Sequence, residues 1–158
     1  MLSEFPSPSE LQGAVQGTLL YLTLYSFIFI PFQSFSKIYL WSKKKRAQQT
    51  KKDDVRRVSL KETKYYNARD SLALCGDRTV GNFLEQAICF LPIYWMHALW
   101  VDPTQSWNLA LAYTIFRAVY PVFFLYAPFL VLVSTVPGYL ICLYIYYQVL
   151  TQVAFASV

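Results

Sequence analysis

Cysteine, histidine and glycine are scarce in this chain of 158 residues, which has three, one and five of them respectively. The cysteines stand far apart, at positions 75, 89 and 142, and form no Cys-x-x-Cys pair, so they predict neither a disulfide framework nor a zinc site. There is also no glycine-rich phosphate loop and no cluster of metal ligands. We therefore expect no bound metal, and we expect His97 to be a packed, hydrogen-bonded residue.

Acidic residues are few as well, nine against fourteen Lys and Arg, which leaves a net charge of +5. The excess is local, because eleven of the fourteen basic residues lie between Lys43 and Arg69. Basic and aromatic residues do not alternate there as they do on a nucleic-acid-binding surface. This composition predicts a cytosolic loop flanking a membrane and no nucleic-acid partner, with binding of anionic lipid headgroups as the functional alternative.

Apolar residues dominate the rest of the chain, at 56% hydrophobic and 18% aromatic, which is typical of a multi-pass membrane protein. The apolar runs predict a single all-α transmembrane domain over 1–158, contacting membrane lipids. Its spans are expected at about 13–41, 79–101, 106–126 and 129–155, with a basic cytosolic loop over 42–77. Because SKKKR follows the first span, we expect both termini on the opposite, non-cytosolic side.

Prolines and polar turn residues predict where these helices bend, begin and end. Pro31 is expected to kink the first span, and the Pro137-Gly138 pair is the corresponding signal in the last one. Asp77 is expected to cap the second helix, and Asp102-Pro103 is expected to start the turn that follows it.

Three polar residues, Arg78, Asn82 and Glu85, follow one stripe at the start of the second predicted helix. A charge at the centre of a bilayer costs roughly 2.5 to 3.5 kcal/mol on insertion scales, so such residues normally face a partner helix or a wet cavity. Arg117 in the third helix is expected at a similar depth, roughly 13 Å below the same surface, which makes an ion pair with Glu85 geometrically reasonable.

Two interpretations of this stripe remain open. In one, the charged residues clamp the second and third helices together, within one chain or between copies. In the other, Arg78 and Arg117 hold an anionic ligand in a cavity open to the cytosol, and Tyr120 or Tyr126 donates a hydrogen bond to it.

The segments RTVGNFLEQ and FRAVYP, which hold the stripe and the Arg117–Tyr120 pair, resemble the MAPEG family, the membrane-associated proteins in eicosanoid and glutathione metabolism. The sequence of these segments is most similar to an uncharacterised, microsomal glutathione S-transferase-like branch of that family. The resemblance implies an integral membrane four-helix bundle that forms a homotrimer, in the endoplasmic reticulum or another organellar membrane. It also implies glutathione as the ligand, bound between subunits near the cytosolic face by Arg78, Asn82, Glu85, Arg117 and Tyr120.

The chain departs from the family pattern where members that transform lipids carry a basic residue near the start of the fourth helix. The corresponding segment, FFLYAPFLVLVST, contains no Lys or Arg, and no catalytic residue is identified. Phe124 stands where the family has a second tyrosine, and Tyr126 is the nearest replacement. Two functions follow: a glutathione transferase or peroxidase acting on a hydrophobic electrophile, or a non-catalytic scaffold or accessory subunit of a larger membrane complex.

Overall fold

The computed structural model describes residues 5–50 and 69–154, and these residues form helices and short connections with no strand. The expected all-α class is confirmed. The first helical run is continuous and is built from α1 (Gln12–Thr23), a π-helical segment η1 (Leu24–Phe29) and α2 (Ile30–Thr50). The second is α4 (Ser71–Trp100). The remaining elements are η2 (Pro103–Gln105), α5 (Ser106–Ala118), α6 (Tyr120–Tyr126), η3 (Pro128–Leu130), α7 (Val131–Val149) and η4 (Leu150–Ala154).

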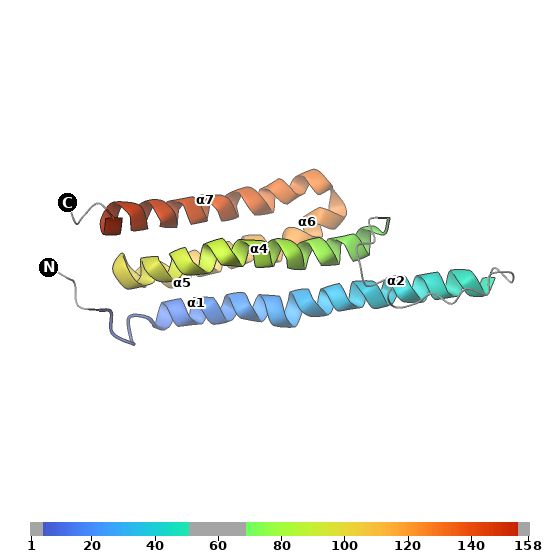
Figure 1. The fold of residues 1–158 in the computed structure, drawn as a ribbon, viewed down its shortest axis with the longest axis horizontal. Coiled ribbons are helices and arrows are strands. Elements are labelled where there is room, and N and C mark those ends of the chain that lie inside the picture. Colours follow the sequence, from blue (N-terminus) through green and yellow to red (C-terminus); the bar gives the residue numbers. More distant parts are fainter. Residues whose placement is uncertain (1–4, 51–68, 155–158) are drawn as a thin grey trace.

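These helical runs lie side by side along a common long axis (Figure 1). The long first run packs against α5 with its beginning and against α4 with its later part, and α7 packs against both α4 and α5. The start of α1 and the end of α7 lie at the same end of the molecule (Figure 1). The described helices therefore pack against one another along their length, with both ends of the described chain at one end of the molecule (Figure 1).

Three stretches are long and apolar enough to cross a membrane: Gln12–Gln49, Pro103–Tyr126 and Val131–Gln152. The remaining predicted span, 79–101, lies almost wholly within α4, which does not reach the same hydropathy although it has 30 residues. At 1.5 Å per residue, α4 is about 45 Å long and exceeds the roughly 30 Å of a bilayer core. Its polar residues, including Arg78 and Glu85, account for the lower hydropathy.

The helix continues through Pro31 because the preceding segment is wound more loosely. Proline has no backbone N–H and crowds the turn before it. Here that turn is π-helical, and the N–H of Ile30 donates to the carbonyl of Tyr25, five residues earlier. A π-helical turn is one of the recognised ways in which a helix absorbs a local disturbance.

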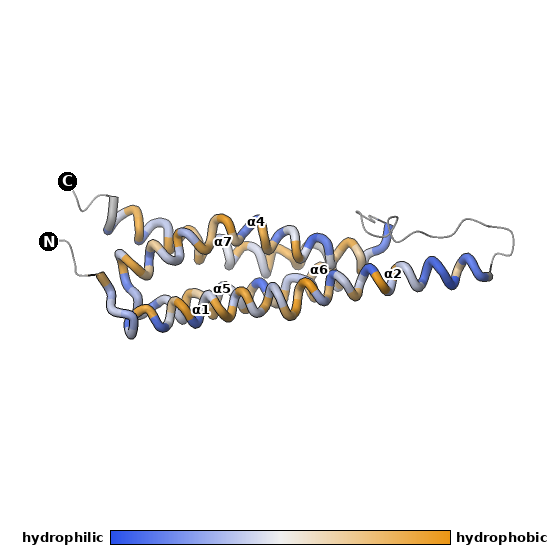
Figure 2. The backbone as a smooth tube through the Cα atoms, turned by 60° about the horizontal axis from the view of Figure 1, so that its bottom comes forward, coloured by the Kyte–Doolittle hydropathy of each residue, from blue (hydrophilic) through white to orange (hydrophobic). Residues whose placement is uncertain are grey.

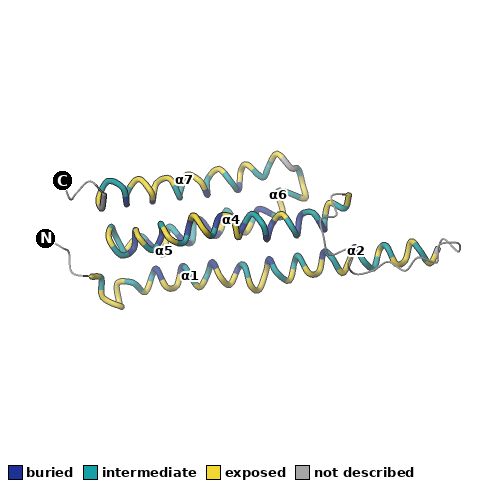
Figure 3. Tube along the Cα trace, viewed as in Figure 1, coloured by how far each residue is buried: buried dark blue, intermediate teal, exposed yellow. Residues whose placement is uncertain are grey.

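Aromatic rings form the centre of the packing between α1, α4 and α5. The ring centroids of Phe90 and Tyr113 are 3.8 Å apart, and those of Tyr21 and Phe83 are 4.1 Å apart. The buried hydroxyl of Tyr94 lies 3.2 Å from the carbonyl oxygens of both Ala14 and Ser106. Figure 3 shows the buried positions concentrated on the inward sides of the helices. Aromatic residues of the sequence therefore build the core as well as the membrane-facing surface.

The polar segment predicted over 42–77 is shorter than expected, because helices extend into it from both sides. α2 reaches Thr50, and α4 begins at Ser71. The predicted cap at Asp77 is wrong: Asp70 has the extended backbone of a cap and accepts a hydrogen bond from the Ala73 N–H at 3.1 Å. Part of the predicted loop, residues 51–68, lies outside the described residues.

Asp77 instead lies inside α4 and fastens it to α2. Its carboxylate pairs with the Lys37 ammonium group at 2.7 Å and accepts a hydrogen bond from the Gln33 amide at 2.8 Å. The two helices approach closely at this level, since a Cβ atom on Gly76 would lie 2.6 Å from the Ser36 hydroxyl oxygen. Buried small residues in the first turns of α4 therefore let the helix begin earlier than the polar sequence around Asp77 predicted.

The turn between α4 and α5 supplies a prediction about acid stability. The Thr104 hydroxyl donates to the Asp102 carboxylate at 2.6 Å, and the Thr104 N–H and the Gln105 amide donate to it as well. These hydrogen bonds, that of the Thr104 hydroxyl first, lower the pKa of Asp102 below its usual value. Ionised Asp102 therefore stabilises the folded protein fully above its unfolded-state pKa of about 3.9. This contribution is lost as the pH falls through the lower folded-state pKa.

We expect Asp102→Ala to lower the free energy of unfolding by about 1 kcal/mol at pH 7, since several donors lose their acceptor. The difference from the unaltered protein should narrow as the pH falls through the lowered folded-state pKa, below which Asp102 is protonated in both states. Thermal melting of both proteins in detergent from pH 7 to pH 3 measures this. A constant difference across that range would contradict the carboxylate's role.

Candidate ligand pocket

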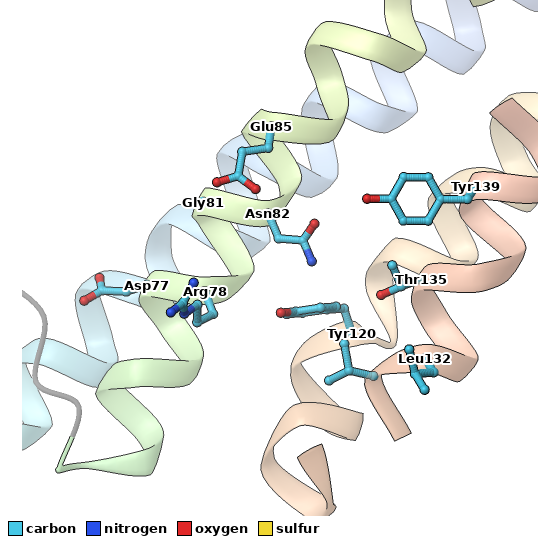
Figure 4. Close-up of a pocket in the computed structure, with 10 residues that line it drawn as sticks. Asp77, Arg78, Gly81, Asn82, Glu85, Tyr120, Leu132, Thr135 and Tyr139 are labelled. Carbon is cyan, nitrogen blue, oxygen red and sulfur yellow. The ribbon is translucent and has the colours of Figure 1, made fainter. Parts of the chain in front are cut away.

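A polar pocket of about 250 Å³ lies between α4, α6 and α7. It is found toward the end of the molecule where α2 leaves the other helices (Figure 1), and Figure 4 shows it in close-up. Polar residues from all three helices line it, together with a few small or apolar ones. The lining residues are Asp77, Arg78, Gly81, Asn82, Glu85, Tyr120, Val131, Leu132, Thr135 and Tyr139.

The α4 side of the pocket is made by the predicted stripe of Arg78, Asn82 and Glu85. The three residues share one side of α4 because offsets of four and seven return to the same helical face. In Figure 4, Asn82 extends from α4 into the space in front of Thr135 and Tyr139. Arg78 and Glu85 are exposed, whereas Asn82 is half-buried. The stripe therefore brings one cation, one amide and one carboxylate to the same opening.

The opposite side presents hydroxyl groups. Tyr120 begins α6 and is buried, and in Figure 4 its hydroxyl points toward Arg78. Thr135 and Tyr139 are four residues apart on α7 and face the pocket together. The Thr135 hydroxyl is buried and has no hydrogen-bond partner among the described residues, and the Gln86 amide donates to the Tyr139 hydroxyl at 2.5 Å. This side can donate and accept hydrogen bonds, and it carries no charge.

Four of the six predicted ligand-binding residues thus line one pocket: Arg78, Asn82, Glu85 and Tyr120. The structure places the other two elsewhere. Tyr126, at the end of α6, is 84% exposed and does not line the pocket. Arg117 does not line it either, and its side chain is buried among α5 and α7 residues.

The predicted ion pair between Arg117 and Glu85 is wrong for the single chain. Arg117 is 2% exposed, and its three side-chain nitrogens have no hydrogen-bond partner among the described residues. Its guanidinium carbon lies 5.2 Å from the centroid of the Tyr113 ring, and a Cβ on Gly138 would lie 2.7 Å from its Nη2 atom. Equal depth did not bring the charges together, because Arg117 turns toward α7 while Glu85 is exposed on α4.

Sequence reasoning missed the α7 side of the pocket. Thr135 and Tyr139 stand in an apolar helix that has four tyrosines, all of them exposed. Their spacing of four residues, with the Pro137-Gly138 pair between them, is a usable signal, because it puts two hydroxyls on one face of the last span. Asp77 was also missed as a lining residue, since it was assigned to the helix end.

His97 is buried as expected, at 1% exposure, but the predicted hydrogen bonds to its ring are absent among the described residues. Within residues 5–50 and 69–154, no group of three or more His, Cys, Asp or Glu residues is arranged to hold a metal ion. The residues that line the pocket instead offer ionic and hydrogen-bonding groups to an organic ligand.

Apolar helices of membrane-spanning length and a polar pocket toward one end define a multi-pass α-helical membrane protein. More narrowly, the chain belongs to the MAPEG family, whose sequence pattern matches residues 17–151. The match covers most of the chain and contains every residue that lines the pocket. Comparison with curated proteins found no match, and comparison with solved structures found none.

Proposed function

We propose that this membrane protein binds glutathione in the pocket between α4, α6 and α7. The observation that carries the proposal is the meeting of Arg78, Asn82, Glu85 and Tyr120 in one cavity, from two helices distant in sequence. Glutathione carries carboxylates and an ammonium group, so its site needs charges of both signs. Arg78 suits a carboxylate, Glu85 suits the ammonium group, and Asn82 suits a peptide amide.

The exposed face of α4 supports the further proposal of a homotrimer with the ligand between neighbouring chains. Arg78 and Glu85 are exposed on the same helix as Leu84 and Ile88, which are 46% and 77% exposed. Charged groups turned outward at membrane depth are costly unless protein or a wet cavity covers them. A second copy packed along α4 would cover the charges and close the outer side of the pocket.

The pocket supports binding more strongly than turnover. A glutathione transferase holds the ligand as a thiolate, and a thiol with a pKa near 8.5 needs a nearby cation or strong donor to ionise at neutral pH. The α6 and α7 side offers only the hydroxyls of Tyr120, Thr135 and Tyr139, and no Lys or Arg follows Arg117 in the chain. These observations favour the second candidate, a non-catalytic scaffold or accessory subunit that keeps the ligand site.

We expect Arg78→Ala to weaken glutathione binding by about ten- to a hundredfold, the usual range for losing a charge-assisted hydrogen bond. Isothermal calorimetry on the detergent-purified protein measures the affinity. Arg69→Ala is the matched control, because Arg69 is exposed and does not line the pocket. An ultraviolet difference spectrum of the same complex shows whether the bound sulfur is a thiolate.

The outcomes separate the two functions. Binding with a thiolate band supports a transferase or peroxidase, whereas binding without the band supports a protein that holds the ligand without activating it. Failure of the unaltered protein to bind glutathione, or equal binding by Arg78→Ala, would overturn the assignment of this pocket.

A further inference from the structure

A charge pair between α2 and α4 lies beside the pocket. Asp77 of α4 lines the pocket, and its carboxylate pairs with the Lys37 ammonium group of α2 at 2.7 Å. In Figure 4 the Asp77 carboxylate points away from Asn82 and Tyr120, toward α2. Lys37 is not among the residues that line the pocket. It can therefore influence a ligand there through its charge and through the position that it gives to Asp77.

The two charges of this pair are only weakly screened by water. Figure 2 shows hydrophilic residues gathered at the end of the bundle where α4 begins and α2 extends past the other helices. The side chains of Lys37 and Asp77 are nevertheless only 24% and 11% exposed. Charges that are largely removed from water act over longer distances than charges on an open surface. A change in either charge should therefore be felt inside the pocket.

The position of the Asp77 carboxylate is fixed by two residues of α2. The Gln33 amide donates to Oδ1 of Asp77 at 2.8 Å, and the Lys37 ammonium group contacts the same oxygen. Gln33 and Lys37 are four residues apart, so they share one face of α2. The helices approach closely here, since a Cβ atom on Gly76 would lie 3.1 Å from the Cα atom of Gln33. The packing of α2 on α4 therefore holds the Lys37 charge next to Asp77.

The pair matters because two carboxylates line the pocket among the described residues, those of Asp77 and Glu85. Glutathione has two carboxylates and one ammonium group, so it carries one net negative charge at neutral pH. One pocket carboxylate suits the ammonium group, and a second one without a counter-ion would repel the ligand. The Lys37 ammonium group offsets the charge of Asp77. This comparison depends only on the presence or absence of one charge on Lys37.

We propose that the Lys37–Asp77 pair sets the ligand charge that this pocket accepts. Lys37 is a positioning residue, which acts through Asp77 without touching the ligand, and the inference rests on the proposed glutathione site. With the pair intact, the pocket accepts a ligand that carries one net negative charge. When Lys37 is neutralised, Asp77 loses its counter-ion and the pocket favours ligands without a net negative charge.

The test compares two ligands that differ by one charge, on the full chain in detergent at low salt. Glutathione carries one net negative charge, and its glycine monoethyl ester has no net charge. Isothermal calorimetry measures the affinity of each ligand for the unaltered protein and for every variant. The loss that a variant causes is compared between the ligands, because the ester itself lacks one carboxylate contact. Thermal melting of each variant confirms that it is folded.

We expect Lys37→Gln to weaken glutathione binding by about tenfold and binding of the ester by less than about threefold. This is the order of effect for one charge within a Debye length of the ligand. Combining Lys37→Gln with Asp77→Asn removes both charges and should return the glutathione affinity to within about threefold of the original. Gln33→Leu is the matched control, because it removes a hydrogen bond to Asp77 and no charge. It should leave the ratio of the two affinities unchanged.

The unaltered protein separates failure of this inference from failure of the proposed site. If it binds neither ligand, the site assignment is overturned and the inference with it. If it binds glutathione, an equal loss of both ligands in Lys37→Gln would overturn the inference alone, as would no recovery in the double variant. The pair would then be only a structural link between α2 and α4. Tighter glutathione binding by Lys37→Gln would also overturn it, because Asp77 would then serve the ammonium group of the ligand.

Discussion

Replacing Gly17 with alanine is expected to lower the free energy of unfolding by about 2–3 kcal/mol, at the upper end of what one added methyl group costs in a packed core. A Cβ atom at this position would overlap the Cβ of Ala110 on α5 and would lie 2.5 Å from the Tyr94 hydroxyl oxygen. Relief requires α1 and α5 to separate, or Tyr94 to give up its hydrogen bonds to Ala14 and Ser106. Small residues such as glycine allow the backbones of membrane helices to approach this closely.

Gly81→Ala is the matched control, because a Cβ added at Gly81 meets nothing within 4 Å. Alanine favours a helix over glycine by about 1 kcal/mol, so this variant should melt at or above the temperature of the unaltered protein. Gly17→Ala should melt several degrees lower, at about 2–4 °C per kcal/mol for a chain of this size. Equal melting temperatures of the two variants, measured in the same detergent, would contradict the close packing of α1 on α5.

Arg117→Met is expected to raise the melting temperature by a few degrees. The buried guanidinium has no hydrogen-bond partner among the described residues, and burying an uncompensated charge costs several kcal/mol. Its contact with the Tyr113 ring recovers about 0.5–2 kcal/mol. Methionine has a similar length, adapts its shape and fills the space beside Gly138 without a charge, so the net gain should be about 1–2 kcal/mol.

A double-mutant cycle that combines Arg117→Met with Glu85→Gln tests independently whether Arg117 lacks an ionic partner. If Arg117 and Glu85 do not interact, the two changes should add to within about 0.5 kcal/mol. A fall in the melting temperature of Arg117→Met, together with a larger coupling to Glu85→Gln, would show that an assembled oligomer supplies the ionic partner that the single chain does not. Cross-linking of the same samples reports the oligomeric state in which each value was obtained.

Three of the ten residues that line the candidate site could be predicted from sequence because they lie on one helix. Arg78, Asn82 and Glu85 are brought together by the period of the α-helix alone, which needs no tertiary information. Tyr120 was predicted both as a hydrogen-bond donor to an anionic ligand and through the family resemblance, and the structure places it in the same pocket. Thr135 and Tyr139 come from α7, fifty or more residues after the stripe on α4, and only packing determines which face of α7 meets α4.

Depth along the membrane normal was a poor guide to contacts. Arg117 and Glu85 were expected at similar levels, and the expectation of an ion pair rested on that alone. The direction of a side chain around its helix decides whether two charges at one level can meet, and here the two point to different neighbours. The start of α4 was also predicted too late. Ala73, Cys75 and Gly76 extend the helix through buried contacts, which a count of polar residues does not reveal.

Composition and periodicity determined the all-helical class, the order of the apolar segments, the turn at Asp102 and the polar stripe on α4, because these depend on residues close together in the chain. Tertiary structure alone decided that α4 starts at Ser71 behind its cap Asp70, that Asp77 pairs with Lys37, that Arg117 is buried against Tyr113 and that α7 completes the pocket. Such features depend on the rotation and approach of whole helices. Many weak packing contacts set that rotation together, and no short stretch of sequence encodes it.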